Sequence, residues 1–136
     1  MTNRTALITG ASRGIGRACA VALSEAGARV AVASRNLDQL EELAAQIRAQ
    51  GREALAVAMD MASADSIKAG LAIAAKDFGP ISILVNNAGV TKDGLAMRMK
   101  KEDWDSVIAT NLTGAFLAIQ QVLPAMMRDR WGRIIN

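Results

Sequence analysis

The chain of 136 residues is long enough to bury the core of one domain, and its hydrophobic content of 51% excludes a disordered protein. It contains no histidine, no tyrosine and one cysteine. Histidine acid–base chemistry and histidine-ligated metal sites are therefore excluded, and we expect no bound metal. The formal net charge of +3 suits anionic cofactors. The sequence contains no basic patch interleaved with aromatic residues, so we do not expect it to bind nucleic acid.

Cysteine usage and apolar stretches indicate the compartment. The single Cys19 cannot form an internal disulfide, which is typical of a reducing environment. The first apolar stretch, Ala6-Leu7-Ile8, is too short for a secretion signal and runs into glycines instead of a cleavage site. No apolar run approaches the ~20 residues that span a bilayer. The sequence therefore predicts a cytoplasmic protein without a membrane segment.

Strand and helix patterns alternate along the whole chain. Apolar runs predict strands at Thr5–Thr9, Arg29–Ala33, Ala54–Ala58, Ile81–Asn86 and from Arg133 onward. Helical spacing predicts helices at about Ile15–Ala26, from the cap Asn36 (with Gln39 as capping-box partner) to Gly51, from Ser63 or Ser66 to Phe78, and at about Asp103–Arg130.

This alternation predicts the fold class. Repeated strand–helix units need right-handed crossovers and give a parallel sheet that helices cover on both faces. We therefore expect an α/β fold of the doubly wound Rossmann type, with strand order 3-2-1-4-5 and a ligand outside the carboxyl ends of strands one and four. Because the chain stops at Asn136, in the fifth strand, residues 1–136 are expected to be one incomplete domain, truncated after that strand.

The segment TGASRGIG, Thr9 to Gly16, joins the first predicted strand to the first helix. Backbone N–H groups at a helix N-terminus have no internal partner, and the helix dipole favours negative charge there. We expect Gly10 to turn with positive φ, Gly14 to let a pyrophosphate approach, and Gly16 to let the helix pack closely. The spacing is neither G-x-G-x-x-G nor a P-loop. A plain tight turn is the alternative, but the position favours a cofactor site formed by Gly10, Ser12, Arg13, Gly14, Ile15 and Gly16.

The second predicted strand ends at Ser34-Arg35, which bears on the choice of cofactor. Folds that select NAD place an acidic residue here to hold the ribose 2′-OH, whereas an arginine suits a 2′-phosphate. Arg13 can supply a second guanidinium, and charge-assisted bonds of this kind contribute about 1.5–3 kcal/mol each. Either arginine alone fits an ordinary solvated side chain, but the pair favours NADP.

Two further segments complete the expected cofactor site. Asp60-Met61 ends the third strand, where Asp60 can accept from an adenine amino group or serve as an ordinary loop or cap residue. Asn86-Asn87-Ala88-Gly89 follows the fourth strand beside the glycine turn. Its small residues let a ribose lie against the backbone, and its amides can bridge neighbouring strands; an ordinary Asn-Gly loop is the alternative. We expect cofactor contacts from Asp60, Met61, Asn86, Asn87, Ala88 and Gly89.

The long predicted helix carries a polar residue on its apolar side. Asn111 lies between Ile108 and Leu112, and a buried amide without partners costs about 1–3 kcal/mol, so we expect a backbone or water partner. Either a functional water or a satisfied core asparagine fits this position. The apolar stripe is wider than one sheet contact needs, which indicates a partner subunit or a fully buried helix. Its members are Val107, Ile108, Leu112, Phe116, Ile119, Val122, Leu123 and Met126.

Together these motifs resemble the short-chain dehydrogenase/reductase family over essentially the whole chain. Thr9–Gly16 matches its cofactor turn, Asn86–Gly89 its N-N-A-G motif, and Asn111 the asparagine of its catalytic tetrad. Thr91–Lys100, Trp104 and Gly132–Asn136 resemble the branch that reduces 3-oxoacyl groups on acyl carrier protein in bacterial fatty-acid synthesis. The resemblance implies NADPH as hydride donor, a 3-hydroxyacyl product, and a homotetramer in which the long helix packs on its symmetry mate. It also implies that Asn111 holds a water.

One departure from the family bears on activity. The resemblance implies a catalytic serine and a Tyr-x-x-x-Lys after the fifth strand, with tyrosine as proton donor, but these residues contain no tyrosine. We therefore expect negligible reductase activity from residues 1–136 alone. Two alternative functions stay open. The chain can belong to a related reductase acting on acetoacetyl-CoA, a sugar or another secondary alcohol, or it can be a non-catalytic dinucleotide-binding or oligomerisation module. Residues that would meet an acidic carrier protein, or form a solvated basic face, are Lys100, Lys101, Arg128, Arg130 and Arg133.

Overall fold

The computed structural model describes residues 3–136 as strands that alternate with helices. The strands are β1 (Thr5–Thr9), β2 (Arg29–Ser34), β3 (Ala54–Ala58), β4 (Ile83–Val85) and β5 (Arg133–Ile135). The helices are α1 (Gly14–Glu25), α2 (Leu37–Ala49), α3 (Ala64–Phe78), α4 (Lys101–Ile108) and α5 (Gly114–Arg128). A 3-10 turn, η1 (Ala96–Arg98), precedes α4, and a π-helical segment, η2 (Ala109–Thr113), joins α4 to α5.

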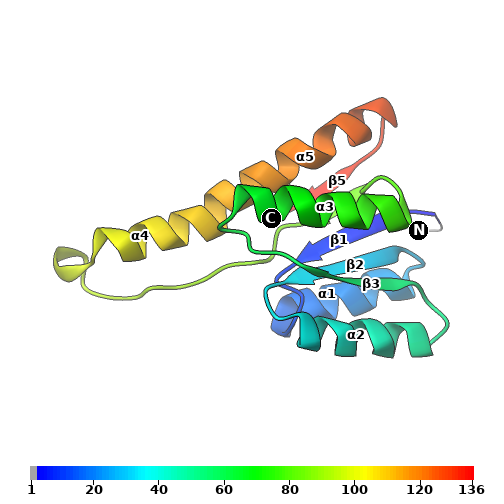
Figure 1. Cartoon of the computed structure of the whole chain (residues 1–136), viewed down its shortest axis with the longest axis horizontal. Coiled ribbons are helices and arrows are strands. Elements are labelled where there is room, and N and C mark those ends of the chain that lie inside the picture. The colour runs from blue at the N-terminus through cyan, green and yellow to red at the C-terminus, as the bar shows by residue number, and fades with distance from the viewer. Residues whose placement is uncertain (1–2) are drawn as a thin grey trace.

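The strands form one parallel sheet in the order β3-β2-β1-β4-β5, which confirms the predicted doubly wound α/β fold. Helices α1 and α2 cover one face, and α3 and α5 cover the other (Figure 1). The chain leaves β1 toward the first face and leaves β4 toward the second. These adjacent strands therefore form a switch point, where the connections diverge and leave a crevice at the carboxyl ends.

The side chains of the buried strands pack into two separate hydrophobic cores, one on each face of the sheet, because successive side chains point to opposite faces. Ile8 of β1 packs on the α1–α2 side, in the same cluster as Leu40 and Leu43. Leu7 packs on the α3–α5 side, in the same cluster as Val122. Both faces of β1 are thus buried, which is why its sequence is continuously apolar instead of alternating.

The N-termini of α2 and α3 are capped by side chains. Asn36 Oδ1 accepts from the backbone N–H of Gln39 (3.2 Å), as predicted. The reciprocal capping-box bond is replaced, because the backbone N–H of Asn36 donates to Ser34 Oγ (3.2 Å). Ser63 Oγ accepts from the backbone N–H of Ser66 (3.2 Å), which identifies Ser63 as the cap of α3.

Strand β4 is shorter than the predicted Ile81–Asn86. Backbone bonds continue on both sides of it: Ser82 donates to Thr5 (3.0 Å) and Asn86 donates to Ile135 (2.8 Å). The difference concerns the ends of the strand, where assignments vary by a residue or two, and not its place in the sheet.

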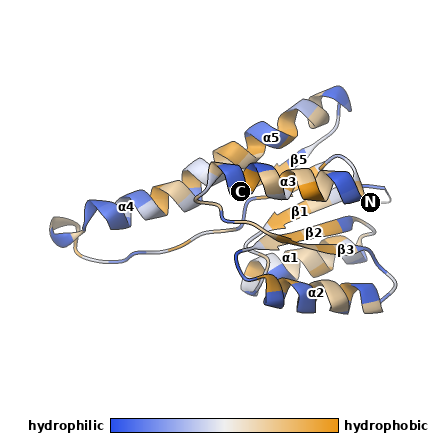
Figure 2. Cartoon of the chain, in the orientation of Figure 1, coloured by the Kyte–Doolittle hydropathy of each residue, from blue (hydrophilic) through white to orange (hydrophobic). Residues whose placement is uncertain are grey.

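The long predicted helix is continuous from Lys101 to Arg128, but its middle turn is π-helical. It extends well beyond the sheet (Figure 1), and α4 contains no buried residue. Hydrophobic residues run along much of this helix (Figure 2). By length and composition it is apolar enough to cross a membrane, with a mean hydropathy of 1.3 in an 18-residue window, 17% of which is buried. The prediction that no stretch approaches that length is therefore wrong, because small and amide residues interrupt the apolar run without ending it.

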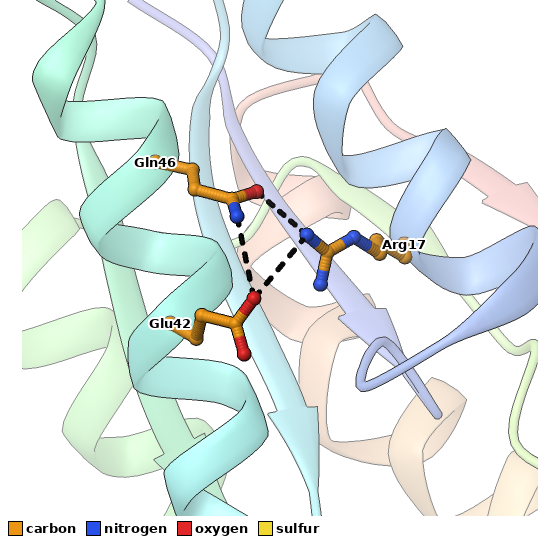
Figure 3. Close-up of polar contacts among 3 residues, drawn as sticks. All are labelled: Arg17, Glu42 and Gln46. Atoms are coloured by element: carbon orange, nitrogen blue, oxygen red, sulfur yellow. Dashed lines mark hydrogen bonds and ion pairs between the residues drawn. The ribbon is translucent and has the colours of Figure 1, made fainter.

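A polar bridge links α1 to α2 at the surface (Figure 3). Arg17 Nη2 donates to Gln46 Oε1 (2.6 Å) and lies 3.9 Å from Glu42 Oε1. Gln46 Nε2 also donates to Glu42 Oε1 (3.3 Å). Exposed pairs of this kind contribute about 0.2–1 kcal/mol each. The bridge joins two helices whose N-termini both lie at the carboxyl edge of the sheet.

Candidate functional site

A cleft of about 340 Å³ opens at the carboxyl ends of the strands. Its walls come from the turns that follow β1, β2, β3 and β4 and from η2. The lining residues are Thr9, Gly10, Ser12, Arg13, Gly14, Ile15, Ala33, Ser34, Arg35, Met59, Asp60, Met61, Asn87, Ala88, Gly89, Val90 and Thr110. The cleft therefore brings together most of the residues that the sequence predicts for a cofactor site.

Three predicted site residues do not line the cleft. Gly16 lies beneath it, where a Cβ atom would come within 2.5 Å of Asn87 Nδ2, so its role is the close packing that we expected. The side chain of Asn86 is turned away: Nδ2 donates to Asn136 Oδ1 (2.8 Å), while Oδ1 is buried without a partner in residues 3–136. Consecutive residues of an extended chain point to opposite sides, so Asn87 faces the cleft and Asn86 faces β5. The third residue is Asn111.

Asn111 is exposed, so the expectation of a buried amide is wrong. The helix at this point extends past the sheet, and η2 widens the turn. The asparagine binds backbone: Oδ1 accepts from the N–H of Val90 (2.8 Å), and Nδ2 donates to the carbonyl oxygen of Val90 (3.0 Å). This pair of bonds fixes the loop after β4 to the long helix. A catalytic role for Asn111 stays a prediction.

The cleft also contains residues that the sequence analysis did not predict. Thr9, Ala33 and Met59 directly precede predicted residues at the ends of three strands, so a wider reading of each strand end would have found them. Val90 follows the Asn86–Gly89 motif by one residue and offers the same signal. Thr110 comes from a helix some twenty residues later, and no motif marks it.

The glycine turn has the geometry of an anion site. Gly10 has φ +64°, and a Cβ atom there would come within 2.8 Å of Ala88 Cα. No side chain caps α1 at Arg13, and the first turn of α1 contains no acidic residue. By contrast α2 and α3 have side-chain caps and an aspartate in the first turn. Because α1 lacks both, its N-terminal donors and its dipole are available to a negatively charged ligand.

Thr9 and Asn87 hold the two sides of the switch point together. Asn87 Nδ2 donates to the carbonyl oxygens of Thr9 and Gly10 (both 3.1 Å). Thr9 Oγ1 accepts from the backbone N–H groups of Asn87 (3.1 Å) and Ala88 (3.0 Å) and donates to the carbonyl oxygen of Val85 (3.3 Å). Thr9 is 1% exposed, so these bonds are shielded from water. The amide therefore bridges neighbouring strands, as expected.

The charged residues of the cleft are mainly basic. Arg13 and Arg35 are exposed, and neither forms an ion pair with another of residues 3–136. Asp60 Oδ1 accepts from the backbone N–H of Ala62 (2.9 Å), so this carboxylate stabilises the turn before α3. Asp60 therefore makes a loop contact while also lining the cleft, and its contact with an adenine stays a prediction. Within residues 3–136 no cluster of acidic or cysteine side chains could hold a metal ion.

A parallel sheet with an uncapped helix N-terminus and a glycine turn at its switch point defines a nucleotide-binding α/β protein of the Rossmann type. The chain belongs to the short-chain dehydrogenase family, whose model matches residues 4–136.

Individual relatives agree with this assignment. The 3-oxoacyl-(acyl-carrier-protein) reductase FabG of Staphylococcus epidermidis strain RP62A is 48% identical over 135 residues, which cover 98% of this chain and 55% of that protein. The corresponding reductase of Synechocystis sp. is 44% identical over 137 residues and 56% of its length. A crystal structure of a metagenomic short-chain oxidoreductase in complex with NADP superposes with a TM-score of 0.95 at 39% identity, covering the whole chain and 62% of that structure. The chain thus spans about half the length of the curated relatives it matches.

Proposed function

We propose that residues 1–136 form the NADP-binding part of an oxidoreductase that reduces 3-oxoacyl groups on acyl carrier protein in fatty-acid synthesis. The observation that carries the proposal is the uncapped N-terminus of α1 beside Arg13 and Arg35, two arginines of the same cleft that form no ion pair within residues 3–136. The similarity to 3-oxoacyl-(acyl-carrier-protein) reductases supports the substrate, and the NADP complex of a structural neighbour supports the cofactor.

The cleft residues suit an extended dinucleotide. The backbone N–H groups at Gly14–Gly16 bind the pyrophosphate, and Arg13 and Arg35 neutralise the 2′-phosphate. The loop Asp60–Met61 meets the adenine, and Asn87–Gly89 lets the second ribose lie against backbone. NADPH supplies the hydride when it is bound. Asn111 orders the loop beside the nicotinamide end through its two bonds to Val90.

Reduction also needs a proton donor for the carbonyl oxygen, and general acids of this kind contribute typically 10²–10⁴-fold to the rate, on the order of several kcal/mol. Residues 1–136 contain neither tyrosine nor histidine to act in that role. We therefore assign cofactor binding to these residues, and the proton transfer to none of them.

The same proposal includes a cytoplasmic homo-oligomer built on the long helix. Trp104, Leu112 and Phe116 are each more than half exposed and follow one another along this helix at spacings of eight and four residues. Burying such side chains is worth about 1.5–3 kcal/mol each, so this face favours a protein partner. A second copy of the chain offers a matching apolar stripe. Basic residues near both helix ends, Lys100, Lys101, Arg128 and Arg130, suit an acidic carrier protein.

Fluorescence titration of the purified protein with NADPH and with NADH tests the proposal. We expect NADPH to bind at least about ten times more tightly, because two charge-assisted contacts depend on the 2′-phosphate. Equal or tighter binding of NADH would contradict the NADP assignment. A parallel assay with acetoacetyl-CoA is expected to show no NADPH oxidation by residues 1–136, and turnover at the rate of an intact reductase would refute the division between binding and catalysis.

A further inference from the structure

Thr110 is a residue of the cleft wall to which no role has been given. It is the second residue of η2, half-buried, and it lines the cleft beside Met61 and Val90. Its hydroxyl makes no hydrogen bond within residues 3–136. A threonine in a helix commonly donates to a carbonyl of the preceding turn, so a cleft-lining threonine whose hydroxyl lacks that bond is available to a ligand.

Two contacts made by the residues that follow Thr110 fix its position. Asn111, the next residue, is bonded twice to Val90 in the loop after β4. Gly114, four residues on, lies so close to the loop after β3 that a Cβ atom would overlap the carbonyl oxygen of Met61. Positions four apart share a helix face, so Thr110 and Gly114 both face the β3 side while Asn111 faces β4.

The π-helical turn makes this arrangement possible. Single π turns inside α-helices are rare and occur frequently at functional sites. Here the widened turn runs from Ala109 to Thr113 and ends at the glycine that contacts Met61. It therefore lets one helix reach both strand-end loops, and Thr110 lies in the same turn, directly before the first of the two contacts.

We propose that Thr110 is a cofactor-binding residue whose hydroxyl hydrogen-bonds the adenosine half of the dinucleotide. Gly114 is then the positioning residue, because its close contact with Met61 sets how far Thr110 reaches into the cleft. The adenosine half is indicated because Gly114 meets Met61, on the β3 side of the cleft, where Arg35 also lies. The inference rests on the proposed NADP site and adds a wall from the long helix to it.

Calorimetric titration of the protein with NADPH and with adenosine 2′,5′-bisphosphate, which represents the adenosine half alone, tests this assignment. Thr110→Val removes the hydroxyl at constant size and is expected to weaken both ligands about 5-fold, as the loss of one neutral hydrogen bond requires. Thr110→Ser keeps the hydroxyl and is expected to bind within about 2-fold of the wild type. Thr113→Val is the matched control, because Thr113 lies in the same π turn but does not line the cleft.

A second pair of variants tests the positioning role. Gly114→Ala pushes the helix off Met61 and is expected to weaken adenosine 2′,5′-bisphosphate about 10-fold, whereas Gly94→Ala, in open space, leaves it unchanged. Thermal unfolding shows that each variant is folded. If the wild type binds neither ligand, the proposed function fails. If the wild type binds both and Thr110→Val binds equally well, the cofactor site stands and the role of Thr110 is refuted.

Discussion

Asn87 and Thr9 are joined by two hydrogen bonds, each of which pairs the side chain of one residue with the backbone of the other. The Asn87 amide donates to the Thr9 carbonyl oxygen, and the Thr9 hydroxyl accepts from the Asn87 backbone N–H (both 3.1 Å). These bonds tie the turn after β1 to the loop after β4. Binding of a ligand between them needs little further ordering of the backbone, which favours affinity.

Thr9→Val is expected to destabilise the protein. The isosteric valine leaves the half-buried backbone N–H groups of Asn87 and Ala88 without an acceptor, at a cost of about 2–4 kcal/mol. Thr9→Ser keeps the hydroxyl and loses one methyl group, which costs about 1 kcal/mol. Urea denaturation measures both free energies of unfolding. A larger loss for Thr9→Ser than for Thr9→Val would show that packing of the methyl, and not the hydroxyl, holds the turn.

Gly10→Ala is expected to cost more stability than Gly51→Ala, although both glycines have positive φ. An alanine in the left-handed region costs about 1–2 kcal/mol at either position. At Gly51 the new methyl enters open space, whereas at Gly10 it meets Ala88 Cα at 2.8 Å. The overlap adds about 1–3 kcal/mol. Chemical denaturation of both variants gives the difference between their free energies of unfolding, which measures the overlap with Ala88. Equal losses of stability would mean that the loop after β4 shifts to accommodate the methyl group.

Arg13→Ala and Arg35→Ala are each expected to weaken NADPH about 10-fold and to change NADH less than about 2-fold, since the lost contact is to the 2′-phosphate. Arg52→Ala is the control, because Arg52 pairs with Glu25 (3.7 Å) and does not line the cleft. Fluorescence titration at fixed ionic strength gives all the dissociation constants. A parallel loss of NADH affinity would assign the arginines to the pyrophosphate instead.

Phe116→Glu is expected to reduce the size of the assembly, because it places a charge in the exposed apolar face of the long helix. Ile73→Glu is the control: Ile73 is 49% exposed, but it lies on α3. Sedimentation velocity distinguishes the two outcomes. A Phe116→Glu protein with an unchanged sedimentation coefficient would contradict a self-association face on this helix.

Much of the fold follows from local sequence patterns. The alternation of apolar runs with helical spacing, together with the handedness of crossovers, leaves few arrangements besides the order 3-2-1-4-5. The same rule brings the carboxyl ends of the strands together, which is why Gly10, Arg35 and Asn87 were correctly expected to lie near one another.

Other features depend on geometry that the sequence does not encode locally. Asn86 and Asn87 are the same residue type at consecutive positions, and the register at the end of β4 decides which one faces the cleft. The apolar stripe around Asn111 looks the same whether the sheet, another copy or nothing covers it, so burial was wrongly expected. Thr110 reaches the cleft through helix packing and a π turn, neither of which leaves a motif.

The two cores on either side of the sheet have a consequence for how substitutions combine. Leu7 and Ile8 are joined by a peptide bond, yet Leu7 belongs to the cluster under α3 and α5 and Ile8 to the one under α1 and α2. Truncating both side chains opens one cavity in each cluster, so we expect a small coupling free energy, within roughly 0.5 kcal/mol. A core substitution on one face of the sheet therefore needs no compensating substitution at the neighbouring position of the same strand.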